Sequence, residues 1–133
     1  MYRWVDHTSE LELHVEAPTE AGVLSEATTA LAELLRGDAG DGGGERVTRE
    51  VTVEADDRAQ LLAAWLEELV FLAETESIVP DDVRFESLDQ RGLRACVEGR
   101  RGEPPHLVKA VTYHRLAFDR ADAGWTATVV LDV

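Results

Sequence analysis

The sequence predicts an α/β protein of the α+β type, in which a single mixed β-sheet is covered on one face by two helices. Several stretches alternate apolar and polar side chains with a period of two, and two longer stretches repeat apolar residues at helical spacing. The expected order, β-α-β-α-β-β-β-β, is typical of one sheet with its helices on one side. The 133 residues suffice for one hydrophobic core, so we expect a single domain over residues 1–133.

The first expected strand and the first helix precede residue 37. Residues 10–16 alternate apolar and polar side chains, which predicts a strand with one buried face. Pro18 ends this strand, and Thr19 offers a side-chain oxygen that can cap a helix N-terminus. Gly37 comes shortly after Leu35, the last apolar residue of this helix, and readily takes the positive φ that ends a helix.

The second strand and the second helix follow the same scheme. Residues 47–55 alternate, and Asp56 or Asp57 can cap the next helix. That helix carries one broad apolar stripe: Leu61, Leu62, Trp65, Leu66, Leu69 and Leu72. We interpret the stripe as core, although a partner-binding surface would need the same pattern. The polar face is expected to be solvated: Glu67, Glu68, Glu74 and Glu76.

The last four strands are expected as two hairpins. The first joins residues 83–88 to 93–97 across Gly92, and the second joins residues 108–118 to 125–133 across residues 122–124. A flexible glycine-rich loop is expected at about residues 37–45. A strand-like stretch follows it, without the helix, Lys and Ser or Thr of a phosphate-binding loop.

Charge and composition exclude several classes of function. The net charge is -14, from 27 acidic and 13 basic residues, so we expect no direct contact with RNA or DNA. Cys96 is the only cysteine, which excludes an intramolecular disulfide and a site built from several thiolates. No apolar run reaches the roughly 20 residues of a membrane helix, and residues 1–6 lack a signal-peptide stretch. We therefore expect a cytoplasmic protein with no membrane partner.

Three groups of residues stand apart as candidates for chemistry: residues 6–10, 109–114 and 131–133. Glu10, Asp132 and the terminal carboxylate of Val133 offer hard oxygen ligands of the kind that Ca, Mg or Mn prefers. An acidic protein carries carboxylates throughout, so spacing alone does not single out a metal site.

Residues 109–114 leave two interpretations open. A regular strand would place Lys109 and Tyr113 on one face and Thr112 and His114 on the other. This pattern fits an ordinary surface strand, and it also fits a functional patch around His114.

Four blocks of the sequence resemble the archease family. They are residues 6–11 (DHTSEL), 65–72 (WLEELVFL), 108–114 (VKAVTYH), and Trp125 with residues 129–133 (VVLDV). The blocks occur in family order from near the first residue to the last, and the KAVTYH block is the specific one.

The resemblance implies a small cytoplasmic protein that assists an RtcB-type RNA ligase in tRNA splicing or RNA repair. Archeases speed guanylylation of the ligase's active-site histidine and allow multiple turnover. The family's metal site falls here on Glu10 and Asp132, with a backbone or terminal oxygen of Val133. Glu10 stands where the family usually has Asp, and the loop at residues 102–106 is shorter than the family's.

The leading hypothesis is a non-enzymatic ligase activator with a divalent metal ion, which meets RNA and GTP only through the ligase. Five residues are candidates for supporting or ligase-contact roles: Asp6, His7, Lys109, Tyr113 and His114. Two rival hypotheses are a metal-dependent phosphoester hydrolase with His7 or His114 as base, and a chaperone-like binding module with a structural metal.

Overall fold

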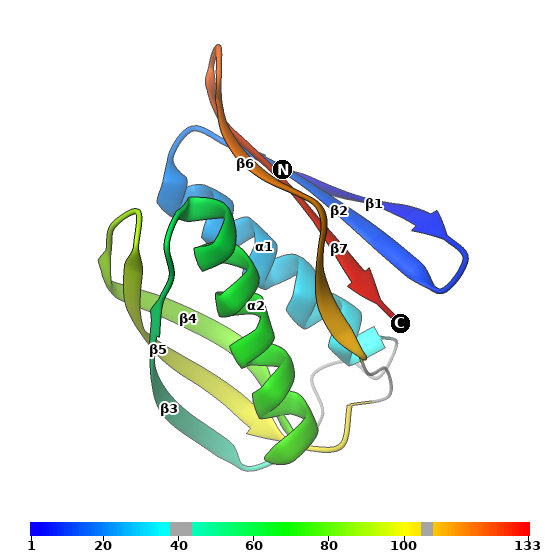
Figure 1. Ribbon diagram of the computed structural model, residues 1–133. Helices are drawn as coiled ribbons and strands as arrows, with labels where there is room; N and C mark the ends of the chain where they lie inside the picture. Colours follow the sequence, from blue (N-terminus) through cyan, green and yellow to red (C-terminus); the bar gives the residue numbers. More distant parts are fainter. Residues whose placement is uncertain (38–43, 105–107) are drawn as a thin grey trace.

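The structure is a computed structural model that describes residues 1–37, 44–104 and 108–133. Most of the glycine-rich loop and part of the 102–106 loop therefore lie outside the described residues. The described elements follow one another along the chain (Figure 1): β1 (Tyr2–His7), β2 (Glu10–Ala17), α1 (Glu20–Arg36), β3 (Arg46–Glu54), α2 (Arg58–Thr75), β4 (Ile78–Leu88), β5 (Gly92–Arg101), β6 (Ala110–Ala121) and β7 (Gly124–Asp132).

The strands form two antiparallel sheets, so the prediction of one mixed sheet is wrong, while the α+β class is confirmed. One sheet has the order β1-β2-β7-β6 and the other the order β3-β5-β4. Alternation along a strand predicts which of its faces is buried but not which strand lies beside it. Two sheets with one apolar face each satisfy the same pattern as one larger sheet.

The two helices lie between the sheets (Figure 1). Helix α1 contacts β2 of the four-stranded sheet and β4 of the three-stranded sheet, and α2 contacts β6, β3 and β4. The predicted cover on a single face is therefore also wrong, because each helix buries side chains against both sheets. The apolar stripe of α2 belongs to the core, as predicted.

Trp65 on α2 lies at the centre of this core and is fully buried. Its indole Nε1 donates a hydrogen bond to Thr28 Oγ1 of α1 at 2.8 Å, and Thr28 in turn donates to the Leu24 carbonyl at 2.7 Å. The Trp65 ring also packs 5.4 Å from the ring of Phe85 on β4. One side chain thus joins both helices to the three-stranded sheet.

The predicted helix ends agree with the structure. Thr19 accepts a hydrogen bond from Gly22 N, and Asp57 rather than Asp56 accepts one from Gln60 N. Gly37 follows α1 with a φ of 54°.

Strand β1 was not expected from the sequence. Its polar and apolar residues do not alternate cleanly, because Trp4 and Val5 are adjacent. The turn to β2 also lacks the Asn-Gly or Gly-Gly signal of a tight hairpin, since Ser9 takes the positive φ of 60° there. Pairing with β2 makes this segment the edge strand of its sheet.

Strand β4 begins at Ile78, before the predicted residue 83, and includes Pro80. Pro80 lacks an N–H, but β4 is an edge strand and its register shifts just after Pro80, which are the places where a sheet tolerates proline.

Candidate functional site

Glu10 and Asp132 lie directly opposite each other on neighbouring strands. Glu10 is the first residue of β2, Asp132 is the last residue of β7, and the antiparallel register pairs them. On the flanking strands, Glu10 pairs with His7 of β1 and Asp132 pairs with Ala110 of β6. We call Glu10 and Asp132 the carboxylate pair.

The alternation of both strands places the carboxylate pair on the outer face of the four-stranded sheet. The next register pair, Leu11 and Leu131, belongs to the opposite face, which is turned toward the helices, and Leu131 is fully buried there. Directly opposite residues have Cβ atoms about 4.5–5.5 Å apart. Two carboxylates at that separation can share one cation.

Main-chain hydrogen bonds fix the strand ends beside the carboxylate pair. The amide of Val133 donates to the Ser9 carbonyl at 3.1 Å, and the amide of Lys109 donates to the Asp132 carbonyl at 2.8 Å. Val133 is thereby held against the turn between β1 and β2, close to Glu10 in the sheet.

The donor set fits a hard divalent cation with oxygen ligands. Glu10 and Asp132 supply two carboxylates, and the main chain of Val133 lies at the same strand end, bonded to Ser9. Over residues 1–37, 44–104 and 108–133, no three His, Cys, Asp or Glu side chains converge well enough to hold a metal. Main-chain oxygens and water would therefore have to complete the ligand shell.

Glu12 occupies a polar position of the alternating strand, where a solvent-facing side chain is expected, but it is only 8% exposed. Val5 and Val130 flank it on the two neighbouring strands, which separates its carboxylate from water. Burial raises the pKa of Glu12, but hydrogen bonds from His7 and His14 and the charge of Arg115 outweigh burial and hold the pKa below its usual value.

The contacts of Glu12 define a second group on the outer face. Oε2 lies 3.5 Å from His7 Nε2 and 3.4 Å from His14 Nε2, and Oε1 lies 3.3 Å from Arg115 Nε. We call Glu12, His7, His14 and Arg115 the Glu12 cluster. Arg115 also reaches to 3.9 Å from Glu10 Oε2, so the cluster adjoins the carboxylate pair.

A bulge in β6 brings Arg115 to this place. The register runs from Thr112 opposite Val130 to Ala117 opposite Thr128, so residues 113–116 face a single residue of β7. Arg115 takes a φ of 57° within the bulge. The prediction of a regular strand with alternating faces is therefore wrong after Thr112.

Tyr113 and His114 lie in the bulge and are both exposed. Partial burial of the Tyr113 phenol, followed by the negative charge of nearby Glu67 of α2, raises the pKa of Tyr113. The His114 amide donates to Thr112 Oγ1 at 3.3 Å.

The remaining predicted residues are placed unevenly. His7 joins the Glu12 cluster, whereas Asp6 pairs with Leu11 and so belongs to the helix-facing side of the sheet, where it is exposed at the strand end. Lys109 is exposed, and its main-chain amide donates to the main-chain carbonyl of Asp132 rather than to a carboxylate of the pair.

Three members of the Glu12 cluster were missed by sequence reasoning: Glu12, His14 and Arg115. Glu12 looks like any other polar residue of an alternating strand, and its burial depends on valines from two partner strands. The nearby pair of histidines at positions 7 and 14 was the available signal, because both flank Glu12 within a few residues.

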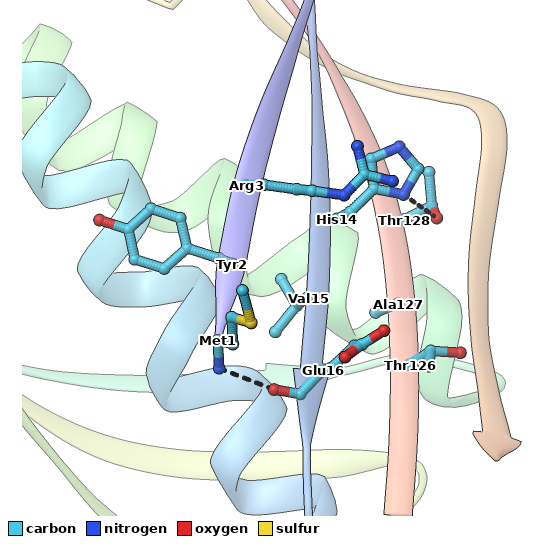
Figure 2. A pocket seen from close by; sticks show the side chains of 9 residues that line it. All are labelled: Met1, Tyr2, Arg3, His14, Val15, Glu16, Thr126, Ala127 and Thr128. Carbon is cyan, nitrogen blue, oxygen red and sulfur yellow. Dashed lines mark hydrogen bonds between the residues drawn. The ribbon is translucent and has the colours of Figure 1, made fainter. Parts of the chain in front are cut away.

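A hollow of about 300 Å³ lies farther along the same sheet (Figure 2). Arg3 extends from β1 across His14, and His14 Nδ1 lies 3.4 Å from Thr128 Oγ1. Glu16 and Thr126, low in Figure 2, also line the hollow. Residues 14–16 are four to six positions along β2 from Glu10, which corresponds to about 13–20 Å. This hollow is therefore separate from the carboxylate pair.

The fold and the site together define a class: small α+β proteins with two helices between antiparallel sheets and a pair of carboxylates at one sheet end. The model of the Archease protein family (MTH1598/TM1083) matches residues 2–133. The chain therefore belongs to the archease family. No helix among the described residues is long and apolar enough to span a membrane.

Individual relatives agree with the family. A protein archease of Methanosarcina acetivorans is 30% identical, over 99% of this chain and 95% of the relative. The solution structure of Methanobacterium thermoautotrophicum protein 1598 matches with a TM-score of 0.73 and 27% identity, over 99% of this chain and 98% of the other. The crystal structure of a Thermotoga maritima archease, described as a possible chaperone, shares the fold with a TM-score of 0.68 and 18% identity, over 100% of this chain and 98% of the other.

Proposed function

We propose that this protein activates an RtcB-type RNA ligase in tRNA splicing or RNA repair, as a non-catalytic cofactor in the cytoplasm. The observation that supports the proposal best is the register that sets Glu10 directly opposite Asp132. This pair coincides with the positions that the family resemblance assigns to metal binding. RNA and GTP reach the protein only through the ligase, since a net charge of -14 repels phosphates.

Glu10 and Asp132 would hold a divalent cation, Ca, Mg or Mn, with an oxygen of Val133. When bound, the cation supplies positive charge that can stabilise phosphate oxygens of a nucleotide on the ligase. The Glu12 cluster fixes the outer face beside the pair, because Glu12 holds His7 and Arg115 in place through its two carboxylate oxygens. His7, Lys109 and His114 are available as contacts to the ligase.

Guanylylation of the cognate ligase tests the proposal. The rate is measured with GTP and saturating metal, with wild-type protein, with Asp132→Asn and with Glu16→Gln, an exposed carboxylate of the same strand face as Glu10. We expect stimulation by the wild type and by Glu16→Gln, and its loss with Asp132→Asn. Absence of stimulation by the wild type would refute the proposal.

A chaperone-like binding module with a structural metal is the second candidate, favoured by the description of the Thermotoga maritima relative. In that case the metal would stabilise the strand end around Asp132 and Val133. Asp132→Asn would then lower the melting temperature in metal and ligase activation together. A metal that supports the ligase directly predicts lost activation with little change in stability.

A further inference from the structure

Phe71 and Tyr113 are two large hydrophobic side chains that the structure leaves in solvent. Phe71 on α2 is 55% exposed, and Tyr113 in the β6 bulge is 58% exposed. Both adjoin Glu67: the charge of Glu67 acts on the Tyr113 hydroxyl across the contact between α2 and β6, and Phe71 follows Glu67 by four residues, one helical turn along α2. We call Phe71 and Tyr113 the aromatic patch.

Three of the four helix neighbours of Phe71 are carboxylates. Its neighbours at three and four positions along α2 are Glu67, Glu68, Glu74 and Thr75, and all four are exposed. After Arg58, α2 carries no basic residue. On α2, the patch therefore combines an apolar centre with a negatively charged rim.

The aromatic patch adjoins β6, the edge strand beside β7, whereas the carboxylate pair lies on β2 and β7 on the outer face of the same sheet. Tyr113 is three residues beyond Ala110, which pairs with Asp132, and this corresponds to about 10 Å along β6 and about 5 Å across to β7. A typical protein interface covers about 800 Å² of each partner, which is roughly 30 Å across. One partner that extends around the β6 edge can therefore reach both Tyr113 and the carboxylate pair.

We propose that the aromatic patch is the docking surface for a basic protein partner, which inserts an apolar side chain beside Phe71 and sets Lys or Arg against the glutamate rim. This inference rests on the proposed function, in which that partner is the ligase. Exposed aromatic side chains with a polar rim are typical of protein interfaces. The negative charge of the rim favours a partner with a positively charged surface, and docking here brings that partner close to the carboxylate pair.

The same charges disfavour two other occupants. A second copy of this chain would bring two glutamate rims together, and like charges across an interface oppose association. RNA would place its phosphates against the same rim. Both occupants give distinct results in the test below.

The test measures the Kd for the cognate ligase by calorimetry and the rate of ligase guanylylation, with four proteins. These are the wild type, Phe71→Ala, Glu74→Arg on the rim, and Glu86→Arg, the same charge change at an exposed position of β4. We expect the Kd to rise about tenfold or more with Phe71→Ala and about three- to tenfold with Glu74→Arg. Glu86→Arg should bind as the wild type does.

At saturating concentrations, Phe71→Ala should stimulate guanylylation as strongly as the wild type, because its carboxylate pair is intact. Circular dichroism verifies that each variant is folded, and Glu74→Arg tests the rim independently of Phe71. Binding by Phe71→Ala and Glu74→Arg within twofold of the wild type overturns this inference alone. Failure of the wild type to bind the ligase overturns the inference and the proposed function together. If the wild type instead forms dimers or RNA complexes, and Phe71→Ala abolishes them, the patch binds those occupants and the inference is overturned.

Discussion

Replacing Glu12 with Gln is expected to lower the free energy of unfolding by about 1–2 kcal/mol at pH 7. Gln keeps the size of the side chain and one hydrogen-bonding oxygen, but it removes the charge. Glu12 is 8% exposed and lies between Val5 and Val130, so water does not replace the lost partners well. The substitution thus isolates the charge of the Glu12 cluster.

The magnitude follows from the contact with Arg115. Two unit charges at the observed 3.3 Å attract by about 1.3 kcal/mol in water and by about 5 kcal/mol at an effective dielectric constant of 20. The Arg115 side chain is 45% exposed, which brings the interaction toward the lower figure. His7 and His14 add weaker hydrogen bonds, part of which Gln retains.

Urea unfolding at pH 7 measures the effect, with Glu16→Gln as the matched control. Glu16 lies on the same strand and the same sheet face but is exposed, so its variant should stay within about 0.5 kcal/mol of the wild type. If Glu12→Gln were no less stable than Glu16→Gln, the charge contacts of Glu12 would not contribute to folding and the reasoning would be refuted.

Two further predictions concern hydrogen bonds to α1. Thr28→Val should lower the free energy of unfolding, measured in urea, by about 1–3 kcal/mol, because the buried Nε1–H of Trp65 loses its acceptor. Thr29→Val, at the exposed neighbouring position, is the control and should change it little. Equal effects of the two substitutions would contradict this prediction. The Tyr2 hydroxyl donates to the Glu33 carboxylate, and burial followed by this bond raises the pKa of Tyr2 to about 12. This stabilisation is complete well below pH 10 and is lost as the pH rises toward 12. Tyr2→Phe should therefore lower the free energy of unfolding more at pH 8 than at pH 11. A loss of the same size at both pH values would contradict the assignment.

Periodicity predicted the elements of this fold better than their assembly. The apolar stripe of α2 requires burial wherever the helix packs, so the sequence alone indicated that Trp65 is in the core. The division into two sheets depends on which strand pairs with which, and this choice arises from contacts between distant segments. Strand β1 shows the complementary failure, since its pairing with β2 stabilises a segment whose own pattern is weak.

The candidate site divides along the same line. Alternation in residues 10–16 predicts that Glu10 is turned away from the core, but only the register of β2 with β7 sets it opposite Asp132. The family resemblance supplied that pairing before the structure did. The Glu12 cluster had no such guide, because the Arg115 contact depends on an irregular stretch of β6 that no period describes.

The β6 bulge explains how the outer face of an acidic protein accommodates Glu10 and Glu12 at adjacent outward positions of one strand. Two carboxylates so close repel each other unless cations lie between or beside them. The bulge turns Arg115 toward both, but the guanidinium lies 3.3 Å from Glu12 and 3.9 Å from Glu10. Arg115 therefore compensates the charge of Glu12 more than that of Glu10. The less compensated charge of Glu10, beside Asp132, is then available to the cation that we propose it binds.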